Sequence, residues 1–290
     1  MNEVVKYNNY MNKLYFKKFK AVEYDILMAL CAKLRDQDTN TIVFSFTDLK
    51  NIIHDTKHTN NNFIECLKSM NRKLMDIICE IEIDGKIVMF VLFPLFEIDP
   101  IKQELTVCVN ERFKFILNEL IKNFTRFDLS EFLGLKSKYS KTLYRLLKQY
   151  RTTGRYDVKI DDFRKKIDCP ASYSNKYIMD LVIKPVLKEL QNYFNDLQCT
   201  TQYAHKRGRP VIGYLFTFTP ENRKSVQDCM QEEKQAFSNK NASKYINFPQ
   251  RQYDYDTLEK ELLNQSMPDS EINQPDDEFL QEQLKSIFDK

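Results

Sequence analysis

One pattern of predicted secondary structure occurs twice in this chain, about 114 residues apart. Each copy has the periodicity of a short strand, a helix, a longer helix and a hairpin. Shifting the first copy by 114 residues aligns seven core-type positions: Phe44 with Val158, Phe46 with Ile160, Leu49 with Phe163, Ile53 with Ile167, Phe63 with Tyr177, Ile64 with Ile178 and Leu67 with Leu181. We therefore predict an α+β protein of two tandem winged-helix domains related by internal duplication.

The second copy, residues 158–220, carries the clearest local signals. An acidic helix start is followed by a Cys-Pro break and then by a second helical period. The front of this second helix, where a recognition helix meets bases, holds Ser174, Asn175 and Lys176. Two alternating segments, 200–203 and 211–219, flank a glycine- and proline-containing turn with three cations, Lys206, Arg207 and Arg209. This segment therefore predicts a helix-turn-helix followed by a basic wing.

Charge is divided unevenly along the chain. Residues 1–130 carry 18 basic and 18 acidic side chains, residues 131–220 carry 17 and 8, and residues 221–290 carry 9 and 15. The three blocks are thus neutral, +9 and −6, which together give the net charge of +3. A basic block centred on a helix-turn-helix indicates nucleic acid as the partner, whereas a basic block alone is equally typical of a solvated face.

Catalytic and metal-binding patterns are missing from the sequence. There is no Walker A motif, and only five glycines are available for a phosphate-binding loop. The three histidines include no HxH pair, and the seven cysteines include no CxxC pair, which argues against a zinc site or a disulfide framework. No run is long enough to span a bilayer, and the start lacks the apolar core of a signal peptide. We expect a cytoplasmic, non-enzymatic protein without a metal or cofactor.

Four segments follow from these patterns. We expect a loosely attached N-terminal arm (1–20), a first winged-helix domain (21–123), a second one (124–220) and an acidic, partly flexible tail (221–290). In the first domain, Thr47 is the expected cap of the short helix, and the hairpin of the duplicated pattern lies at 79–93 around Asp84-Gly85. Residues 111–122 have the period of an amphipathic helix, as do residues 279–288 in the tail. The last helix either folds on a partner or docks on its own domain.

Candidate DNA contacts fall into three sets. In the second domain, Asn175 suits adenine and Lys176 suits guanine, whereas Asp180 either accepts from cytosine or pairs with a neighbouring lysine. The wing cations suit phosphate or the minor groove. The corresponding positions of the first domain are Thr59, Asn60, Asn61, Asn62, Lys68, Arg72 and Lys73. Lys141 and Arg145 lie on one helical stripe with Lys148, which either touches phosphate or is solvated. Pro185, inside a helix, should kink it.

Four short segments resemble a known family. Residues 139–150 (YSKTLYRLLKQY), residues 183–190 (IKPVLKEL), the wing residues 206–209 (KRGR) and residues 124–127 (FTRF) resemble motifs of iteron-binding plasmid replication initiators, the Rep_3 or RepB family. The motifs occur in the expected order over about residues 20–220. The sequence departs from the family pattern at two places. Gln191 follows Leu190 where the family commonly has Ile-Asn, and Pro210 follows the wing cations. Residues 248–256 are similar to extensions on initiators of theta-replicating plasmids from Gram-positive bacteria.

The resemblance implies a mechanism. Initiators of this family bind direct repeats (iterons) in double-stranded origin DNA, each winged helix placing a helix in successive major grooves. Homodimers in equilibrium with monomers are joined mainly through the first domain and repress the initiator's own promoter at an inverted repeat. Tandem binding melts an adjacent AT-rich duplex, and host replication proteins (initiator, helicase or primase) are recruited. A winged-helix transcription regulator is the nearest alternative, and a DNA-nicking enzyme is a distant one.

Overall fold

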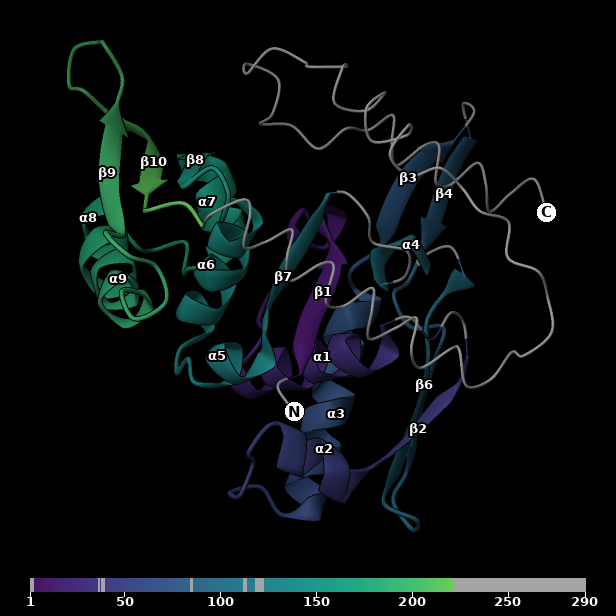
Figure 1. The fold of residues 1–290 in the computed structure, drawn as a ribbon. Helices are drawn as coiled ribbons and strands as arrows, with labels where there is room; N and C mark the ends of the chain where they lie inside the picture. Colours follow the sequence, from purple (N-terminus) through teal and green to yellow (C-terminus); the bar gives the residue numbers. More distant parts are fainter. Residues whose placement is uncertain are drawn as a thin grey trace, which may run out of the picture. The chain divides into compact units, whose positions relative to one another are not determined.

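The computed structural model describes residues 3–35, 37, 40–83, 86–111, 114–117 and 123–221. Two winged helices with the same order of elements lie in this part of the chain (Figure 1). The first, winged helix 1, consists of α1 (Ala21–Leu34), β2 (Ile42–Ser45), α2 (Phe46–Ile52), α3 (Asn60–Met75), β5 (Leu95–Asp99) and β6 (Glu104–Cys108). Its sheet has the order β2-β6-β5, and both strand pairs are antiparallel.

Winged helix 2 repeats this arrangement. It consists of α6 (Lys138–Gln149), β8 (Arg155–Lys159), α7 (Ile160–Ile167), a long helix, β9 (Gln198–Tyr203) and β10 (Val211–Thr217). The long helix runs through α8 (Asn175–Tyr177), the π-helical segment η3 (Ile178–Ile183) and α9 (Lys184–Leu190). Its sheet order, β8-β10-β9, matches that of winged helix 1 strand for strand. The predicted fold class is therefore confirmed.

The short helix of each winged helix begins directly after a strand. Phe46 and Ile160, which the repeat aligns with each other, are the first residues of α2 and α7. In winged helix 1 the Ser45 hydroxyl accepts a hydrogen bond from the Asp48 amide at 3.0 Å. Ser45, rather than the predicted Thr47, therefore caps α2.

The wing of winged helix 1 is not the predicted hairpin. Residues 79–93 form β3 (Cys79–Ile83) and β4 (Lys86–Phe90), which pair only with each other among the described strands. The hairpin that occupies the position of β9–β10 is β5–β6, because β6 pairs with β2 as β10 pairs with β8. Leu105 and Val107 of β6 are fully buried, whereas Ile87 and Met89 of β4 are 65% and 61% exposed. Core packing thus selects the later hairpin as the wing.

The offset of 114 residues holds only for the first half of the pattern. Leu49 and Phe163 are both fully buried, as expected for equivalent core positions. In the second helix, however, Tyr177 and Leu181 are 54% and 55% exposed, so their predicted alignment with Phe63 and Leu67 is wrong. An offset of 115 aligns Phe63 with Ile178 and Leu67 with Val182, and these four side chains are buried. The turn of winged helix 2 is therefore one residue longer.

The alignment of the two copies shifts by one more residue inside the long helix of winged helix 2. Pro185 has no N–H group, and its ring would clash with the carbonyl of residue 181 in a regular α-helix. The segment before it is π-helical, and the Lys184 amide donates to the carbonyl of Met179, five residues back. Beyond this segment an offset of 116 aligns Met70 with Val186, both buried. The predicted kink at Pro185 thus takes the form of a π-helical insertion.

Residues 4–20 are not a loosely attached arm, and that prediction is wrong. Strand β1 (Val4–Asn8) pairs antiparallel with β7 (Phe124–Asp128) along its whole length. Val5 and Tyr7 are fully buried, and Phe16 and Phe19 further along the segment are almost fully buried. The short helix η1 (Asn9–Asn12) follows β1, and α5 (Leu129–Leu133) follows β7. The N-terminal segment is therefore part of the core.

Asn12 connects the N-terminal segment to α6 and to β7. Its Oδ1 accepts from Tyr7 Oη and from Arg145 Nη1, each at 3.1 Å. Its Nδ2 donates to Thr125 Oγ1 at 2.9 Å and to Gln149 Oε1 at 3.0 Å. Because Asn12 is buried, the contacts with Tyr7, Arg145 and Thr125 are shielded from water, and the contact with Gln149 is partly shielded.

Two predicted regions lie largely outside the described residues. Of the predicted helix at 111–122, the structure describes a helical turn, α4 (Lys114–Leu117). The tail beyond residue 221, including the predicted helix at 279–288, lies outside the described residues. The predicted boundaries of the two domains and of the tail stay predictions.

We expect Asn12→Ala to lower the free energy of unfolding by about 1–3 kcal/mol, because it leaves buried donors and acceptors without partners. Chemical denaturation measures this change. Asn192→Ala, at an exposed asparagine, is the matched control and should be neutral. Equal stability of the Asn12→Ala variant and the wild-type protein would contradict the role assigned to this side chain.

Candidate nucleic-acid interface

The two long helices begin with the same capping arrangement. In winged helix 2, Ser174 is the N-cap of α8, and its hydroxyl accepts from the Tyr177 amide at 3.3 Å. In winged helix 1, Thr59 is the N-cap of α3, and its hydroxyl accepts from the Asn62 amide at 3.3 Å. Both residues were predicted at these helix fronts. An asparagine follows each cap as the first helical residue.

Each of these asparagines is held by a cation from the preceding helix. Arg164 Nη2 on α7 donates to the Asn175 Oδ1 atom and to the Tyr173 carbonyl, both at 2.8 Å. Lys50 on α2 makes the equivalent pair of contacts, to Asn60 Oδ1 at 2.6 Å and to the carbonyl of His58 at 2.9 Å. We call each set of contacts a turn brace. It was not predicted from the sequence, although the two cations are 114 residues apart like the rest of the repeat.

Lys176 and Asp180, the other predicted DNA contacts on the long helix of winged helix 2, differ in whether their charged groups are free to meet DNA. Lys176 is exposed, next to the exposed ring of Tyr177. Asp180 is 2.7 Å from Lys184 Nζ, four residues further along the helix. The hydrogen bond from Lys184 lowers the pKa of Asp180. The structure therefore contains the intrahelical ion pair that was the alternative to a base contact by Asp180.

In winged helix 1, the predicted residues on α3 also separate into two groups. Asn61, Asn62 and Arg72 are exposed, and Lys68 is exposed in an ion pair with Glu65 at 2.9 Å. Lys73 instead has its ammonium 2.7 Å from both carboxylate oxygens of Glu23, which is fully buried on α1. Lys73 thus joins α3 to α1, and its predicted DNA contact stays a prediction.

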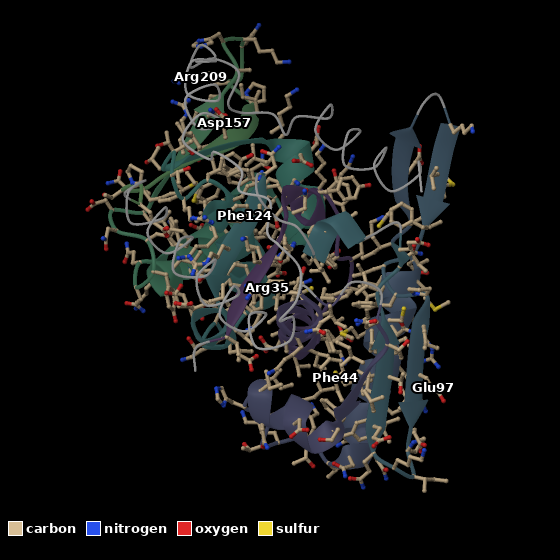
Figure 2. All side chains as sticks on the ribbon, turned by 45° about the vertical axis from the view of Figure 1, so that its right-hand side comes forward. Arg35, Phe44, Glu97, Phe124, Asp157 and Arg209 are labelled. Atoms are coloured by element: carbon tan, nitrogen blue, oxygen red, sulfur yellow. The ribbon has the colours of Figure 1, made fainter. Side chains whose placement is uncertain are left out.

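The predicted basic wing lies in the β9–β10 turn. Lys206, Arg207 and Arg209 are exposed there, and Figure 2 shows Arg209 at the far end of this hairpin. Gly208 has a φ of +83°, a conformation that disfavours other residues. The Arg209 guanidinium lies 5.4 Å from the centre of the Tyr203 ring on β9. The three cations thus lie together on one short loop, and the ring contact places Arg209 against β9.

The predicted stripe on α6 is buried rather than exposed. Lys141 and Arg145 are each 1% exposed. Lys141 Nζ contacts Asp25 Oδ1 of α1 at 2.5 Å and the carbonyl of Phe132 at 2.9 Å. The Arg145 guanidinium packs over the Phe16 ring, 4.8 Å from its centre. Neither side chain can reach DNA, so both predicted contacts are wrong.

Burial also changes the acid strength of the Asp25 and Lys141 pair. Desolvation raises the pKa of Asp25 to about 6 and lowers the pKa of Lys141. Asp25 keeps its partner at hydrogen-bond distance, so the pair joins α1 to α6. These residues therefore support the orientation of the two winged helices instead of contacting a ligand.

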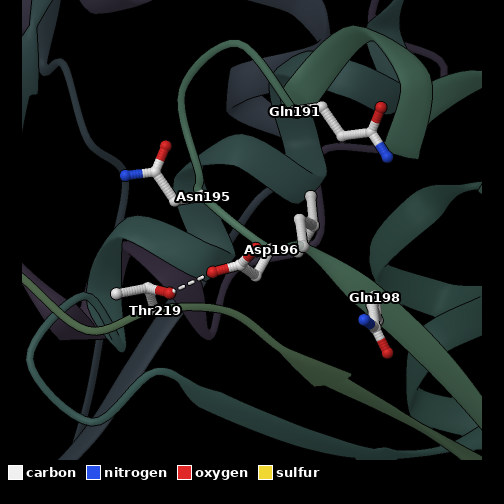
Figure 3. Close-up of a pocket in the computed structure, with 6 residues that line it drawn as sticks. Gln191, Asn195, Asp196, Gln198 and Thr219 are labelled. Carbon is white, nitrogen blue, oxygen red and sulfur yellow. Dashed lines mark hydrogen bonds between the residues drawn. The ribbon is translucent and has the colours of Figure 1, made fainter.

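A polar pocket is present at the other end of the β9–β10 hairpin (Figure 3). Gln191, Asn195 and Asp196 line it together with Gln198, where β9 begins. Thr219, just beyond β10, donates a hydrogen bond to Asp196 Oδ2 at 2.7 Å. Because the wing loop joins the opposite ends of these strands, the pocket is separate from the basic wing.

The described part of the chain shows neither a metal site nor a membrane span. No group of three or more His, Cys, Asp or Glu residues in it is placed to hold a metal ion. None of its helices combines the length and the apolarity needed to cross a membrane.

Comparisons with known proteins agree with this geometry. The family model described as "Initiator Replication protein, WH1" matches residues 4–148, and "Initiator Rep protein, WH2" matches residues 159–218. A curated relative, "Probable replication protein rep" of Bifidobacterium longum (strain NCC 2705), is 40% identical over 223 residues, covering 76% of this chain and 74% of the relative.

The structural comparison gives the same fold. The crystal structure of Pi initiator protein in complex with iteron DNA matches with a TM-score of 0.57 at 14% identity. The match covers 76% of this chain and 98% of that one. At this low identity the likeness concerns the fold alone.

Lys141→Met should lower the free energy of unfolding, by up to about 3 kcal/mol, because it leaves the mostly buried Asp25 carboxylate without its partner. Adding Asp25→Leu should recover much of this loss, since the unpaired charge is then removed. Lys188→Met, at an exposed lysine of α9, controls for the change of charge. Unchanged stability together with weaker DNA binding would show that Lys141 faces DNA after all.

Proposed function

The chain belongs to the family of replication initiator proteins with two winged-helix domains, and from this premise we propose that it binds direct repeats at a plasmid origin. Each winged helix places the front of its long helix in a major groove. The observation that carries the proposal is the pair of capped and braced helix fronts, where the half-buried Asn60 and Asn175 each lie between exposed neighbours. The excess of cations in residues 131–220 supports phosphate as the accompanying target.

The residues divide into base readers and phosphate contacts. Ser174, Asn175 and Lys176 are the proposed readers in winged helix 2, and residues 59–62 in winged helix 1. The wing is proposed to bind phosphate or the minor groove through Lys206, Arg207 and Arg209. Long basic side chains on a loop bind the charged DNA backbone more readily than they read the edge of a base. Lys68 and Arg72 are proposed as further phosphate contacts from α3.

Binding to tandem repeats is proposed to bend and melt an adjacent AT-rich segment, where host replication proteins load. The chain is also proposed to form a homodimer through winged helix 1 and to repress its own promoter in that state. Exposed apolar side chains support the location of this contact. Four side chains are more than half exposed: Met75 at the end of α3, Ile78 just beyond it, and Ile87 and Met89 on β4.

A transcription regulator with the same two winged helices is the alternative. It would bind a lone inverted repeat, whereas an initiator requires several direct repeats next to an AT-rich stretch. No catalytic step is proposed for the chain. Nicking of supercoiled origin DNA by the purified protein, abolished by a chelator, would contradict this.

Lys206→Ala combined with Arg207→Ala should weaken binding to all DNA sequences alike. The log–log dependence of affinity on salt should also flatten by about 0.9 for each phosphate that the variant no longer neutralises. A salt titration measures this slope. Lys165→Ala with Lys188→Ala removes two exposed cations away from the wing and should leave the slope unchanged. An unaltered slope in the wing variant would remove these residues from the phosphate contacts.

A protein that ends at Pro220 should bind the repeats with wild-type affinity but fail to maintain the plasmid. The reason is that the acidic tail is proposed to engage a host partner and not the origin. Gel-shift titration measures the first property and plasmid retention over generations the second. Normal retention without the tail would refute the proposed partner contact.

A further inference from the structure

The turn brace occurs at equivalent positions in both winged helices. In each, a cation on the short helix contacts a carbonyl of the turn and the side-chain oxygen of the first asparagine of the long helix. We infer that Arg164 and Lys50 are positioning residues that fix the orientation of the Asn175 and Asn60 amides, so that each presents N–H donors to DNA and selects against cytosine. This inference rests on the proposed function.

The chemistry of the brace settles which end of each amide faces the cation. Arginine and protonated lysine carry hydrogen-bond donors but no acceptor. The atom of Asn175 that faces Arg164 is therefore its oxygen, and the same holds for Asn60 and Lys50. The contacts at 2.8 Å and 2.6 Å are charge-assisted, which makes them stronger than contacts between neutral groups.

The brace also fixes the backbone on which each asparagine stands. The second contact of Arg164 is the carbonyl of Tyr173, immediately before the N-cap Ser174. In the other copy, Lys50 contacts the carbonyl of His58, immediately before the N-cap Thr59. Each cation thus ties the end of the turn to the start of the long helix.

An amide held in one orientation can recognise fewer bases than a freely rotating one. An asparagine that reads adenine bidentately uses its oxygen and its nitrogen together. Here the oxygen is turned towards the cation, which occupies one of its two acceptor sites, so the Nδ2 donors are the groups presented to the base. Their partners are the acceptors on the major-groove edge: N7 of a purine, O6 of guanine or O4 of thymine. Cytosine presents an amino donor at that edge, so it is the base that the braced amide disfavours.

This result modifies the expectation that Asn175 recognises adenine. Adenine remains acceptable through its N7 atom, but it is no longer distinguished from guanine by this residue. Discrimination between them at that position must come from a neighbour such as Lys176. The same reasoning applies to Asn60 in winged helix 1.

The test is competition binding of the full-length protein to duplexes that carry each base at each position of the repeat. In the wild-type protein, one position read by winged helix 2 should reject cytosine. Asn175→Ala and Arg164→Met should both relax that same position, by about tenfold, and leave the others unchanged. The double variant should relax it no further than Asn175→Ala alone, because both changes remove one contact.

Three further variants separate positioning from a general structural role. Arg164→Lys installs the cation found in the other copy and should retain the preference. Lys165→Met removes one charge from an exposed neighbouring position on α7 and should have no effect on the pattern. Asn175→Asp preserves the contact with Arg164 but replaces the donors by acceptors, so it should shift the preference at that position towards cytosine.

The variant Asn175→Asp keeps the inference testable if Arg164→Met does not fold, which thermal unfolding will reveal. The inference is overturned if Asn175→Asp keeps the wild-type base preference. It is also overturned if a folded Arg164→Met variant loses affinity equally for the repeat and for scrambled DNA. If the wild-type protein itself does not prefer the repeat to scrambled DNA, the proposed function fails instead.

Discussion

The fold depends on a positive charge buried in helix α6. The Arg145 guanidinium donates to Asn12 and packs on Phe16, and both of these residues come from the N-terminal segment. A buried guanidinium is costly unless its N–H groups find acceptors, so α6 requires this segment to remain in place. The Asn12 carbonyl also accepts from Lys166 at 2.8 Å, which extends the same network from α6 to α7, the short helix of winged helix 2. The Asp25–Lys141 pair then joins α6 to α1. Polar contacts of this kind fix an orientation more strictly than apolar packing alone does.

The two winged helices keep one architecture but differ where they are proposed to meet DNA. Both have a braced asparagine at the front of the long helix, and both have a sheet of the same strand order. Winged helix 2 has an extra residue in its turn, a π-helical insertion before Pro185 and a wing with three exposed cations. Winged helix 1 has the added β3–β4 hairpin with exposed apolar side chains. This division suits a protein in which one copy supplies most of the phosphate contacts and the other also meets a protein partner.

The features that were predicted correctly from the sequence are those whose signal lies in a short stretch of chain. Caps, helix periods and the turn around Gly208 identified both long helices and the second wing, because each signal lies within a few residues. Strand β1 was missed because its partner β7 is about 120 residues away and the strand is short. The dipeptide Asp84-Gly85 is a stronger turn signal than the sequence of the β5–β6 loop. For this reason the hairpin at 79–93, and not β5–β6, was predicted as the wing. Lys141 and Arg145 look like a solvated stripe on α6 alone, and only the segment that covers them reveals their burial. The turn brace spans 11 residues in winged helix 2, beyond the reach of local patterns.

The central claim is that both winged helices read the same repeat. Hydroxyl-radical footprinting of the origin by the full-length protein tests it most directly. We expect two protected tracts in each direct repeat, about 10 base pairs apart, one for each recognition helix. A single protected tract per repeat, or protection confined to an inverted repeat, would contradict it.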